Sequence, residues 1–334
     1  MQKQILLKKR PKETPTHNDF EVVETSIGTP SDGEILVKTI YISVDPYLRG
    51  RMNDTKSYIP PFKLNEVISS GVIGQVIESK SNRFDKNDIV LGSLGWQEYN
   101  IIKEDSVRKI NPNIAPESTY LSVLGMTGLT AYFGLLDIGK PNEGETVVVS
   151  GAAGAVGSIV GQIAKIKGCR VVGIAGSEDK VNLLLNDFGF DAAINYNTQD
   201  VGVALEEACP DGIDVYFENV GGTISDAIFP LLNNFARIPV CGAISAYNTA
   251  EDIGPRVQTH LIKTSSLMQG FTVGNYSSRF EEGIQELATW LKDGKLKYEE
   301  TITVGFDKTI DAFLDLFKGA NIGKSLVKVA EIEK

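Results

Sequence analysis

The sequence predicts an α/β protein of two domains, in which a β-rich domain is followed by a doubly wound parallel sheet. The 334 residues exceed the roughly 250–300 at which a single hydrophobic core stops growing. Strand-like runs fill the chain up to residue 120, whereas short apolar runs alternate with helical segments after it. That alternation is typical of βαβ units. We therefore expect the first domain over residues 1–120, completed by residues 299–334, and the second over residues 121–298.

The first domain contains several short runs of apolar and β-branched residues, separated by prolines and polar loops. Runs at this spacing are typical of short antiparallel strands. Glycines interrupt one of them, as happens where a barrel bends or two backbones approach closely. We expect the last strand of the chain to rejoin this domain. The expected strands cover residues 34–43, 67–77, 88–92, 97–102, 300–304 and 325–329, with a helix over residues 307–317.

The second domain repeats a short, continuously apolar run that is followed by a helical pattern. Such runs suit strands that are buried on both faces of a parallel sheet. Right-handed crossovers between these strands would place a ligand at their carboxyl ends. The expected strands cover residues 146–150, 170–175, 192–196, 212–218 and 236–241, and the expected helices cover residues 121–136, 159–167 and 179–188.

The charge balance argues against nucleic acid and anionic membrane surfaces as partners, because the net charge is -10. The basic segment over residues 1–12 has an apolar run of only three residues, Ile5 to Leu7, which is too short for a signal peptide. The longest uncharged stretch, residues 146–164, is interrupted by glycines and is expected to contain a turn rather than a membrane span. We expect a cytoplasmic protein.

The cysteines and histidines do not form a metal-binding pattern. Cys169, Cys209 and Cys241 lack C-x-x-C spacing, and His17 and His260 are isolated in the sequence. A zinc site needs three or four ligands from such residues and carboxylates. We expect no metal, and buried structural thiols in a reducing compartment.

A glycine-rich turn over residues 147–157 joins an expected strand to an apolar helix, with A-x-G-x-x-G at positions 152, 154 and 157. Small residues here let the backbone approach a pyrophosphate, whose charge meets the helix N-terminus. Gly157 would let the helix pack closely on the strand. The alternative is a close-packed turn without a ligand, because a lone glycine pattern is weak evidence.

The second strand of the parallel sheet ends over residues 173–177 without the acid that usually binds the ribose of NAD. Glu178 and Asp179 come slightly later and are expected to cap the next helix. Ser177, Lys180 and Tyr196 could bind a 2′-phosphate instead. The pattern favours NADP(H), although Lys180 could also be an ordinary solvated helix lysine.

Several stretches in order along nearly the whole chain resemble one protein family. They cover residues 43–52, 58–62, 125–132, 152–157, 218–222, 241–248 and 321–324. The chain is similar to the zinc-independent medium-chain dehydrogenases/reductases, in the branch of prostaglandin reductases, plant alkenal double-bond reductases and bacterial curcumin reductase. Two departures are Ser69-Ser70, where small glycines are usual, and Glu218, where Asp is commoner.

The resemblance implies a GroES-like β-barrel domain joined to a Rossmann domain, and a homodimer. It implies reduction of the C=C bond of an α,β-unsaturated ketone or aldehyde, by hydride transfer from NADPH to the β-carbon without a metal. It implies that Tyr247, and secondarily Tyr58, act on a small-molecule substrate. Together with the nucleotide pattern above, it places the cofactor against Met126, Thr130, Gly154, Ala155, Val156, Gly157, Ser177, Lys180, Tyr196, Asn219, Cys241, Gly242, Ala243, Ile244, Ser245, Tyr247, Phe271, Thr272, Val273 and Asn321.

Other functions and roles stay open at this point. A quinone reductase of the same fold, a non-catalytic NADPH-binding protein and, least favoured, a zinc alcohol dehydrogenase are the alternatives. Tyr247, Tyr58 and Asn219 could be ordinary core, loop and turn residues. Asp45 is expected to form a turn, while Arg49 and Arg51 are expected to form structural salt bridges rather than to steer anions.

Overall fold

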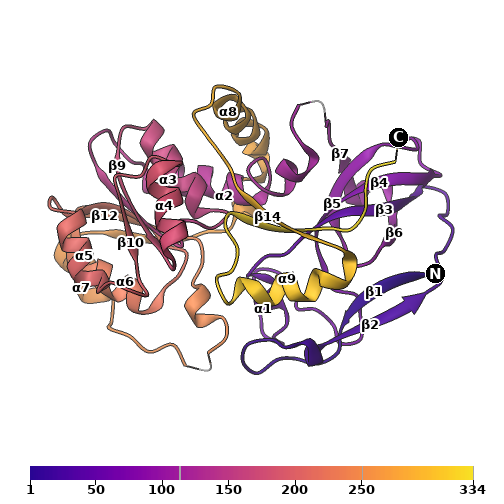
Figure 1. Ribbon diagram of the computed structural model, residues 1–334, viewed down its shortest axis with the longest axis horizontal. Helices are drawn as coiled ribbons and strands as arrows, with labels where there is room; N and C mark the ends of the chain where they lie inside the picture. Colours follow the sequence, from indigo (N-terminus) through magenta and orange to yellow (C-terminus); the bar gives the residue numbers. More distant parts are fainter. Residues whose placement is uncertain (113, 250, 334) are drawn as a thin grey trace. The chain divides into compact units, whose positions relative to one another are not determined.

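The computed structural model describes residues 1–112, 114–249 and 251–333, and the chain divides into two compact units (Figure 1). The first unit contains Met1–Leu121, Glu300–Asn321 and Ser325–Lys334. The second contains Ser122–Glu299 and Ile322–Lys324. Residues 322–324 thus belong to the second unit, whereas the residues directly before and after them belong to the first.

The first unit contains two antiparallel sheets. β1 (Gln2–Leu7) pairs with β2 (Phe20–Thr25). The larger sheet has the order β14-β15-β3-β4-β5-β7, with β6 also paired to β3. The C-terminal strand β15 lies antiparallel to β3, with Leu326 opposite Ser43. The bounds are β3 (Glu34–Ser43), β4 (Ser69–Ser79), β5 (Ile89–Gly95), β6 (Tyr99–Lys103), β7 (Val107–Lys109), β14 (Glu300–Val304) and β15 (Lys324–Lys328).

Aromatic packing joins the C-terminal helix to the core of the first unit. Phe313 of α9 (Thr309–Leu316) contacts Phe20 and Trp96 edge to face, with ring centroids 6.2 and 5.9 Å apart. All three side chains are buried. Such pairs add stability beyond the area they bury, so the segment after β14 is part of this core. The short helix α1 (Leu48–Arg51) follows β3.

The second unit is built on a six-stranded parallel sheet with the order β10-β9-β8-β11-β12-β13. The chain starts in the middle at β8, moves outward through β9 and β10, and returns to continue from β11. This is the doubly wound arrangement that the sequence predicts, with its switch point between β8 and β11. The bounds are β8 (Thr146–Ser150), β9 (Arg170–Ala175), β10 (Ala192–Asn195), β11 (Ile213–Phe217), β12 (Leu232–Val240) and β13 (Leu267–Gly270).

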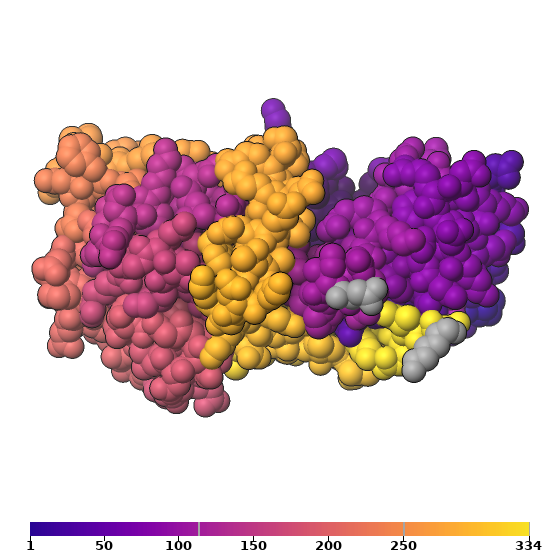
Figure 2. Space-filling model, turned by 90° about the horizontal axis from the view of Figure 1, so that it is seen from above, coloured from indigo at the N-terminus to yellow at the C-terminus, as the bar shows by residue number. Residues whose placement is uncertain are grey.

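Helices pack on this sheet because its strands are apolar on both faces: every residue of β8 is buried. α3 packs against β8 and β9, and α4 against β9 and β10. α8 buries Gly283, Leu287 and Trp290 at helical spacing and leaves its other face at the surface seen in Figure 2. The helices are α2 (Met126–Phe133), α3 (Gly157–Ile166), α4 (Glu178–Asn186), α5 (Val201–Ala208), α6 (Gly222–Ile228), α7 (Gln258–Thr264) and α8 (Phe280–Lys292).

The single helix expected over residues 121–136 is wrong. A 3-10 helix ends at Leu121, and α2 starts only at Met126. The Ser122 carbonyl accepts hydrogen bonds from the Thr127 hydroxyl at 3.0 Å and the Gly128 amide at 3.2 Å, which closes a turn between the two helices. After Phe133 the chain continues as a π-helix over Gly134–Gly139.

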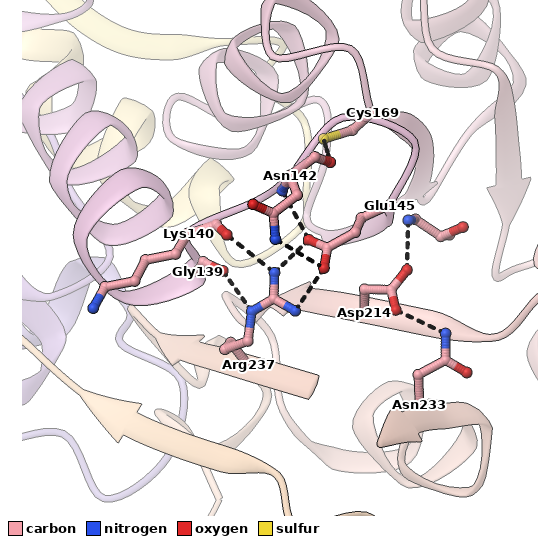
Figure 3. Close-up of polar contacts among 9 residues, drawn as sticks. Gly139, Lys140, Asn142, Glu145, Cys169, Asp214, Asn233 and Arg237 are labelled. Carbon is pink, nitrogen blue, oxygen red and sulfur yellow. Dashed lines mark hydrogen bonds and ion pairs between the residues drawn. The ribbon is translucent and has the colours of Figure 1, made fainter. Parts of the chain in front are cut away.

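A polar network closes the amino-terminal end of the parallel sheet (Figure 3). Arg237 of β12 donates Nε to the Gly139 carbonyl at 2.8 Å and Nη2 to the Lys140 carbonyl at 3.1 Å. Both of its Nη groups also bind the Glu145 carboxylate. Asn142 donates its backbone amide to the same carboxylate at 2.8 Å. The network therefore joins the end of the π-helix, the turn before β8 and the strand β12.

We expect Arg237→Met to lower the free energy of unfolding by about 2 kcal/mol, because it leaves the Glu145 carboxylate and two carbonyls without their charged donor. Burial alone would raise the pKa of Glu145, but hydrogen bonds from Arg237 and Asn142 outweigh it and lower that pKa below its ordinary 4.5. The stabilisation is therefore present above pH 4.5 and is lost as the pH falls through the pKa of folded Glu145.

Urea unfolding of the wild type, Arg237→Met and Glu145→Gln between pH 7 and pH 3 measures both effects. The stability difference between the wild type and Glu145→Gln should shrink toward the acid end. A difference that stayed constant over this range would contradict the proposed linkage to Glu145.

Candidate cofactor site

Six segments of the second unit gather at one edge of the parallel sheet, because the carboxyl ends of parallel strands meet there. Each segment follows one of the six strands and carries residues singled out by the sequence. They are residues 150–157, 176–180, 196, 218–222, 241–247 and 271–273.

The glycine turn lies directly after β8 and leads into α3. Its Ala152 amide donates to the Ile174 carbonyl at 3.0 Å, which ties the turn to β9. A Cβ on Gly157 would lie 2.4 Å from the Gly151 carbonyl oxygen, so only glycine allows this approach. A Cβ on Gly154 would lie 3.2 Å from its nearest neighbour. No side chain caps the first turn of α3 within the described chain, which leaves the helix terminus available to an anion.

A C-terminal segment adds a backbone contact to this turn. The Gly323 amide donates to the Ala153 carbonyl at 2.8 Å, and Gly154 and Gly323 form a parallel bridge. Asn321 precedes Gly323 by two residues, so chain connectivity alone keeps it within about 8 Å of a residue bonded to the turn. Ala155 and Val156 complete the turn between Gly154 and α3.

The end of β9 forms a corner with the end of β10. Ser177 is the N-cap of α4 and accepts the Lys180 amide at 3.3 Å. Serine is favoured here because its hydroxyl reaches the amide of the first turn. Glu178 and Asp179 lie in the first turn of α4, where acids favour the helix dipole as expected, but neither is the N-cap. Glu178 turns toward β10, where its carboxylate accepts Asn195 Nδ2 at 2.6 Å.

Tyr196 and Lys180 both belong to this corner. The Tyr196 hydroxyl would lie 2.6 Å from a Cβ on Gly176, and the side chain is 44% exposed. Lys180 is half-buried, and burial lowers its pKa. A partly desolvated ammonium gains from a negative ligand more than a fully solvated one does. Lys180 is therefore not fully solvated, and its binding to a phosphate stays a prediction.

The switch point between β8 and β11 is occupied by Asn219. Its backbone amide donates to Ser150 Oγ at 2.9 Å, and its Nδ2 donates to the Ser150 carbonyl at 2.7 Å. The side-chain amide therefore has a defined orientation, because a carbonyl oxygen can only accept.

The segment after β12 is bonded to the segment after β11. Ser245 donates its backbone amide and its hydroxyl to the Val220 carbonyl, at 3.0 and 2.6 Å. The Ile244 amide donates to the Asn219 carbonyl at 3.3 Å. Tyr247 is half-buried and folds back along the segment, with its hydroxyl 3.5 Å from the Ala243 amide. Gly242 lies between Cys241 and Ala243 in this turn.

Cys241 begins this segment, and its amide donates to the Glu218 carbonyl at 2.9 Å. Burial of the thiol, and to a smaller extent the nearby Glu218 charge, raises the pKa of Cys241 to about 12. The thiol is therefore protonated at neutral pH and is a poor nucleophile.

Phe271, Thr272 and Val273 follow β13. The Phe271 ring contacts Phe217 edge to face at 6.3 Å and packs against Gly134, where a Cβ would lie 2.3 Å from the ring. This side chain therefore fills the layer beneath the sheet. Thr272 is the N-cap of the 3-10 helix Val273–Arg279, and the Thr272 amide donates to Asn275 Oδ1 at 2.9 Å. Of the two α2 candidates, Met126 is partly exposed, and the Thr130 hydroxyl donates to the Met126 carbonyl at 2.7 Å.

Known proteins are similar to almost the whole of this chain. A family model described as the N-terminal domain of oxidoreductase matches residues 3–110, and one described as a zinc-binding dehydrogenase matches residues 155–289. YfmJ of Bacillus subtilis (strain 168), provisionally named an NADP-dependent oxidoreductase, is 63% identical over 99% of this chain and 98% of its own. The NADPH-dependent curcumin reductase of Escherichia coli (strain K12) is 44% identical over 97% and 96%.

The chain belongs to the medium-chain dehydrogenase/reductase family, in the branch of curcumin, prostaglandin and alkenal reductases. Among solved structures, CurA of Vibrio vulnificus in complex with NADPH superposes with a TM-score of 0.94. It is 43% identical, and the match covers 98% of this chain and 99% of that one.

The zinc in one family description does not fit this family member. Across residues 1–112, 114–249 and 251–333, no group of three or more His, Cys, Asp and Glu side chains is arranged to hold a metal ion. In the same ranges, no helix combines the length and the apolar character needed to cross a bilayer.

Candidates from the first unit of this reductase lie in and around the loop after β3. Tyr58 is 69% exposed. Asp45 is buried and accepts the Ser43 hydroxyl. Arg49 donates to the Pro11 and Glu13 carbonyls at 3.2 and 3.1 Å.

The salt bridge expected for Arg51 is wrong within the described residues. Its Nε donates to the Pro60 carbonyl at 3.1 Å, and its guanidinium lies 3.9 Å from the centroid of the Phe62 ring. Backbone oxygens and an aromatic face thus take the place of a carboxylate.

We expect Gly157→Ala to lower the free energy of unfolding by about 1–3 kcal/mol, because the new methyl group overlaps the backbone of the preceding turn. Gly154→Ala is the matched control, since its Cβ has a clearance of 3.2 Å from the nearest atom. Thermal unfolding of both variants without ligand measures the difference. Equal stability of the two variants would contradict the close approach at Gly157.

Proposed function

We propose that this chain reduces the C=C bond of α,β-unsaturated ketones or aldehydes, with NADPH as reductant and without a metal. The observation that supports it most is the lack of an acid at the end of β9, residues 173–177, in a member of the branch of curcumin, prostaglandin and alkenal reductases. We also propose that the protein is cytoplasmic, as its N-terminal sequence indicates, and that it is a homodimer, as the sequence resemblance implies.

The cofactor is NADP(H), in agreement with the named relatives and with the NADPH complex of CurA. In our proposal Gly154 to Gly157 hold the pyrophosphate at the start of α3. Ser177, Lys180 and Tyr196 bind the 2′-phosphate, while Asn219 and Asn321 bind the nicotinamide half. Residues 241–247 and 271–273 line the nicotinamide, and Met126 and Thr130 add contacts from α2.

The reduction needs donors at the carbonyl oxygen of the substrate. Bound NADPH would supply the hydride that reaches the β-carbon. Negative charge then grows on the carbonyl oxygen, and a donor that is already oriented lowers the barrier most. Tyr247 is our candidate donor because its hydroxyl is held beside the Ala243 amide. Tyr58 is a secondary candidate, and water or a tyrosine would supply the α-carbon proton.

The test of this function is an NADPH-consumption assay with a medium-chain 2-alkenal, an enone and a quinone, followed by product analysis. We expect saturation of the C=C bond with the carbonyl group retained. Faster turnover of the quinone would instead indicate a quinone reductase. Tight NADPH binding without turnover of any acceptor would indicate a non-catalytic binding protein.

We expect Lys180→Ala to weaken NADPH binding by roughly 1.5–3 kcal/mol, which is about 10–100-fold, because a charged hydrogen bond to the 2′-phosphate is lost. NADH binding should stay unchanged, since NADH has no such phosphate. Lys263→Ala, an exposed lysine on α7, is the control. Fluorescence titration measures both affinities, and a wild type that binds NADH and NADPH equally would refute the assignment.

We expect Tyr247→Phe to lower turnover on the order of 100-fold, the scale on which losing one oriented donor acts. NADPH affinity should change much less, because the hydroxyl acts on the substrate carbonyl. Steady-state rates at saturating NADPH, together with a binding titration, separate the two effects. Unchanged turnover over a range of enones would remove Tyr247 from the proposed mechanism.

A further inference from the structure

We propose that Glu218 is a positioning residue, whose buried carboxylate holds the turn after β11 so that Asn219 presents its Oδ1 to the nicotinamide half of the cofactor. The identity of the ligand in this inference rests on the proposed function. The hydrogen bonds that the Glu218 carboxylate accepts, which we call the Glu218 clamp, are a feature of the chain itself.

The Glu218 carboxylate is buried, with 3% of the residue exposed, at the end of β11. Its Oε1 accepts the backbone amides of Val220 and Gly221, both at 2.8 Å. The same oxygen accepts Ser150 Oγ at 3.0 Å, and Oε2 accepts the Ser225 hydroxyl. These four donors are neutral, and hydrogen bonds of this kind to a carboxylate are stronger than those between neutral groups.

The Glu218 clamp reaches Asn219 through Ser150. The Ser150 hydroxyl donates to Glu218 and accepts the Asn219 amide at 2.9 Å, so it links the two residues. Asn219 Nδ2 then donates to the Ser150 carbonyl at 2.7 Å. This hydrogen bond uses one of the two Nδ2 hydrogens and fixes the orientation of the amide, in which Oδ1 can accept an N–H or O–H of a ligand. The nicotinamide carboxamide and its ribose hydroxyls both offer such donors.

The role needs an acceptor rather than a negative charge as such. A glutamine at position 218 keeps one carbonyl oxygen for the two backbone amides and Ser150, while its NH2 group can donate to a rotated Ser225 hydroxyl. An alanine leaves the Val220 and Gly221 amides without their acceptor, which releases the turn. Rescue by glutamine therefore distinguishes positioning by hydrogen bonds from an electrostatic role.

The test compares two ligands on the full-length protein by calorimetric titration: NADPH, and 2′,5′-ADP, which lacks the nicotinamide half. We expect Glu218→Ala and Ser150→Ala to weaken NADPH about 10-fold or more, and to leave 2′,5′-ADP within about twofold. Glu218→Gln should bind both ligands nearly as the wild type does.

The matched control is Asp214→Ala, at the opposite end of the same strand. Its carboxylate also accepts a backbone amide, that of Thr146 at 2.8 Å (Figure 3). This variant should lose stability but keep its NADPH affinity. If Glu218→Ala does not fold, the affinities of Ser150→Ala and Glu218→Gln for the two ligands still test the proposal.

Equal weakening of NADPH and 2′,5′-ADP by Glu218→Ala or Ser150→Ala would overturn the proposal, since it would mean a general disturbance of the unit. Unchanged NADPH affinity in both variants would also overturn it. A Glu218→Gln variant as weak as Glu218→Ala would contradict positioning by hydrogen bonds. A wild type that binds neither ligand would instead contradict the proposed function.

Discussion

The order in which the six parallel strands pair determines where their connections diverge, and sheets of this kind bind ligands at that point. Because the chain leaves β8 in one direction and returns to β11 on its other side, the connections diverge at the carboxyl edge between these two strands. The glycine turn, Asn219 and the segment 241–247 all lie along that edge. Backbone amides and short side chains can approach a ligand there without crossing the buried core.

The parallel sheet could be predicted because its signals are local. Runs such as residues 146–150 and 170–175 are apolar on both faces, and the strands occupy those residues. The strand β1 has an apolar run of only three residues, and β2 has only Val22 and Val23 between two glutamates. The exposed edge strand β13 has only four residues, so none of the three was predicted from the sequence. The break before α2 depends on which groups the Ser122 carbonyl binds, and that is a tertiary property.

Some features of the candidate site could likewise be predicted from the sequence, whereas others depend on packing. The turn at 152–157 and the lack of an acid at residues 173–177 can both be recognised in the sequence. The first predicts a pyrophosphate, and the second favours a nucleotide with a 2′-phosphate. The partial burial of Lys180 and the place of the Phe271 ring beneath the sheet depend on packing. Glu218 stood out only as an unusual residue at its position; its role as the acceptor for a whole turn required knowledge of four partners from three parts of the chain.

The backbone contact between Gly323 and Ala153 has a consequence for biosynthesis. Ala153 and Gly323 lie 170 residues apart in the sequence (323 − 153), so the ribosome translates the glycine turn well before its partner. The turn can gain this hydrogen bond only after Gly323 has left the ribosome. The proposed nucleotide site is therefore completed later in synthesis than the turn itself.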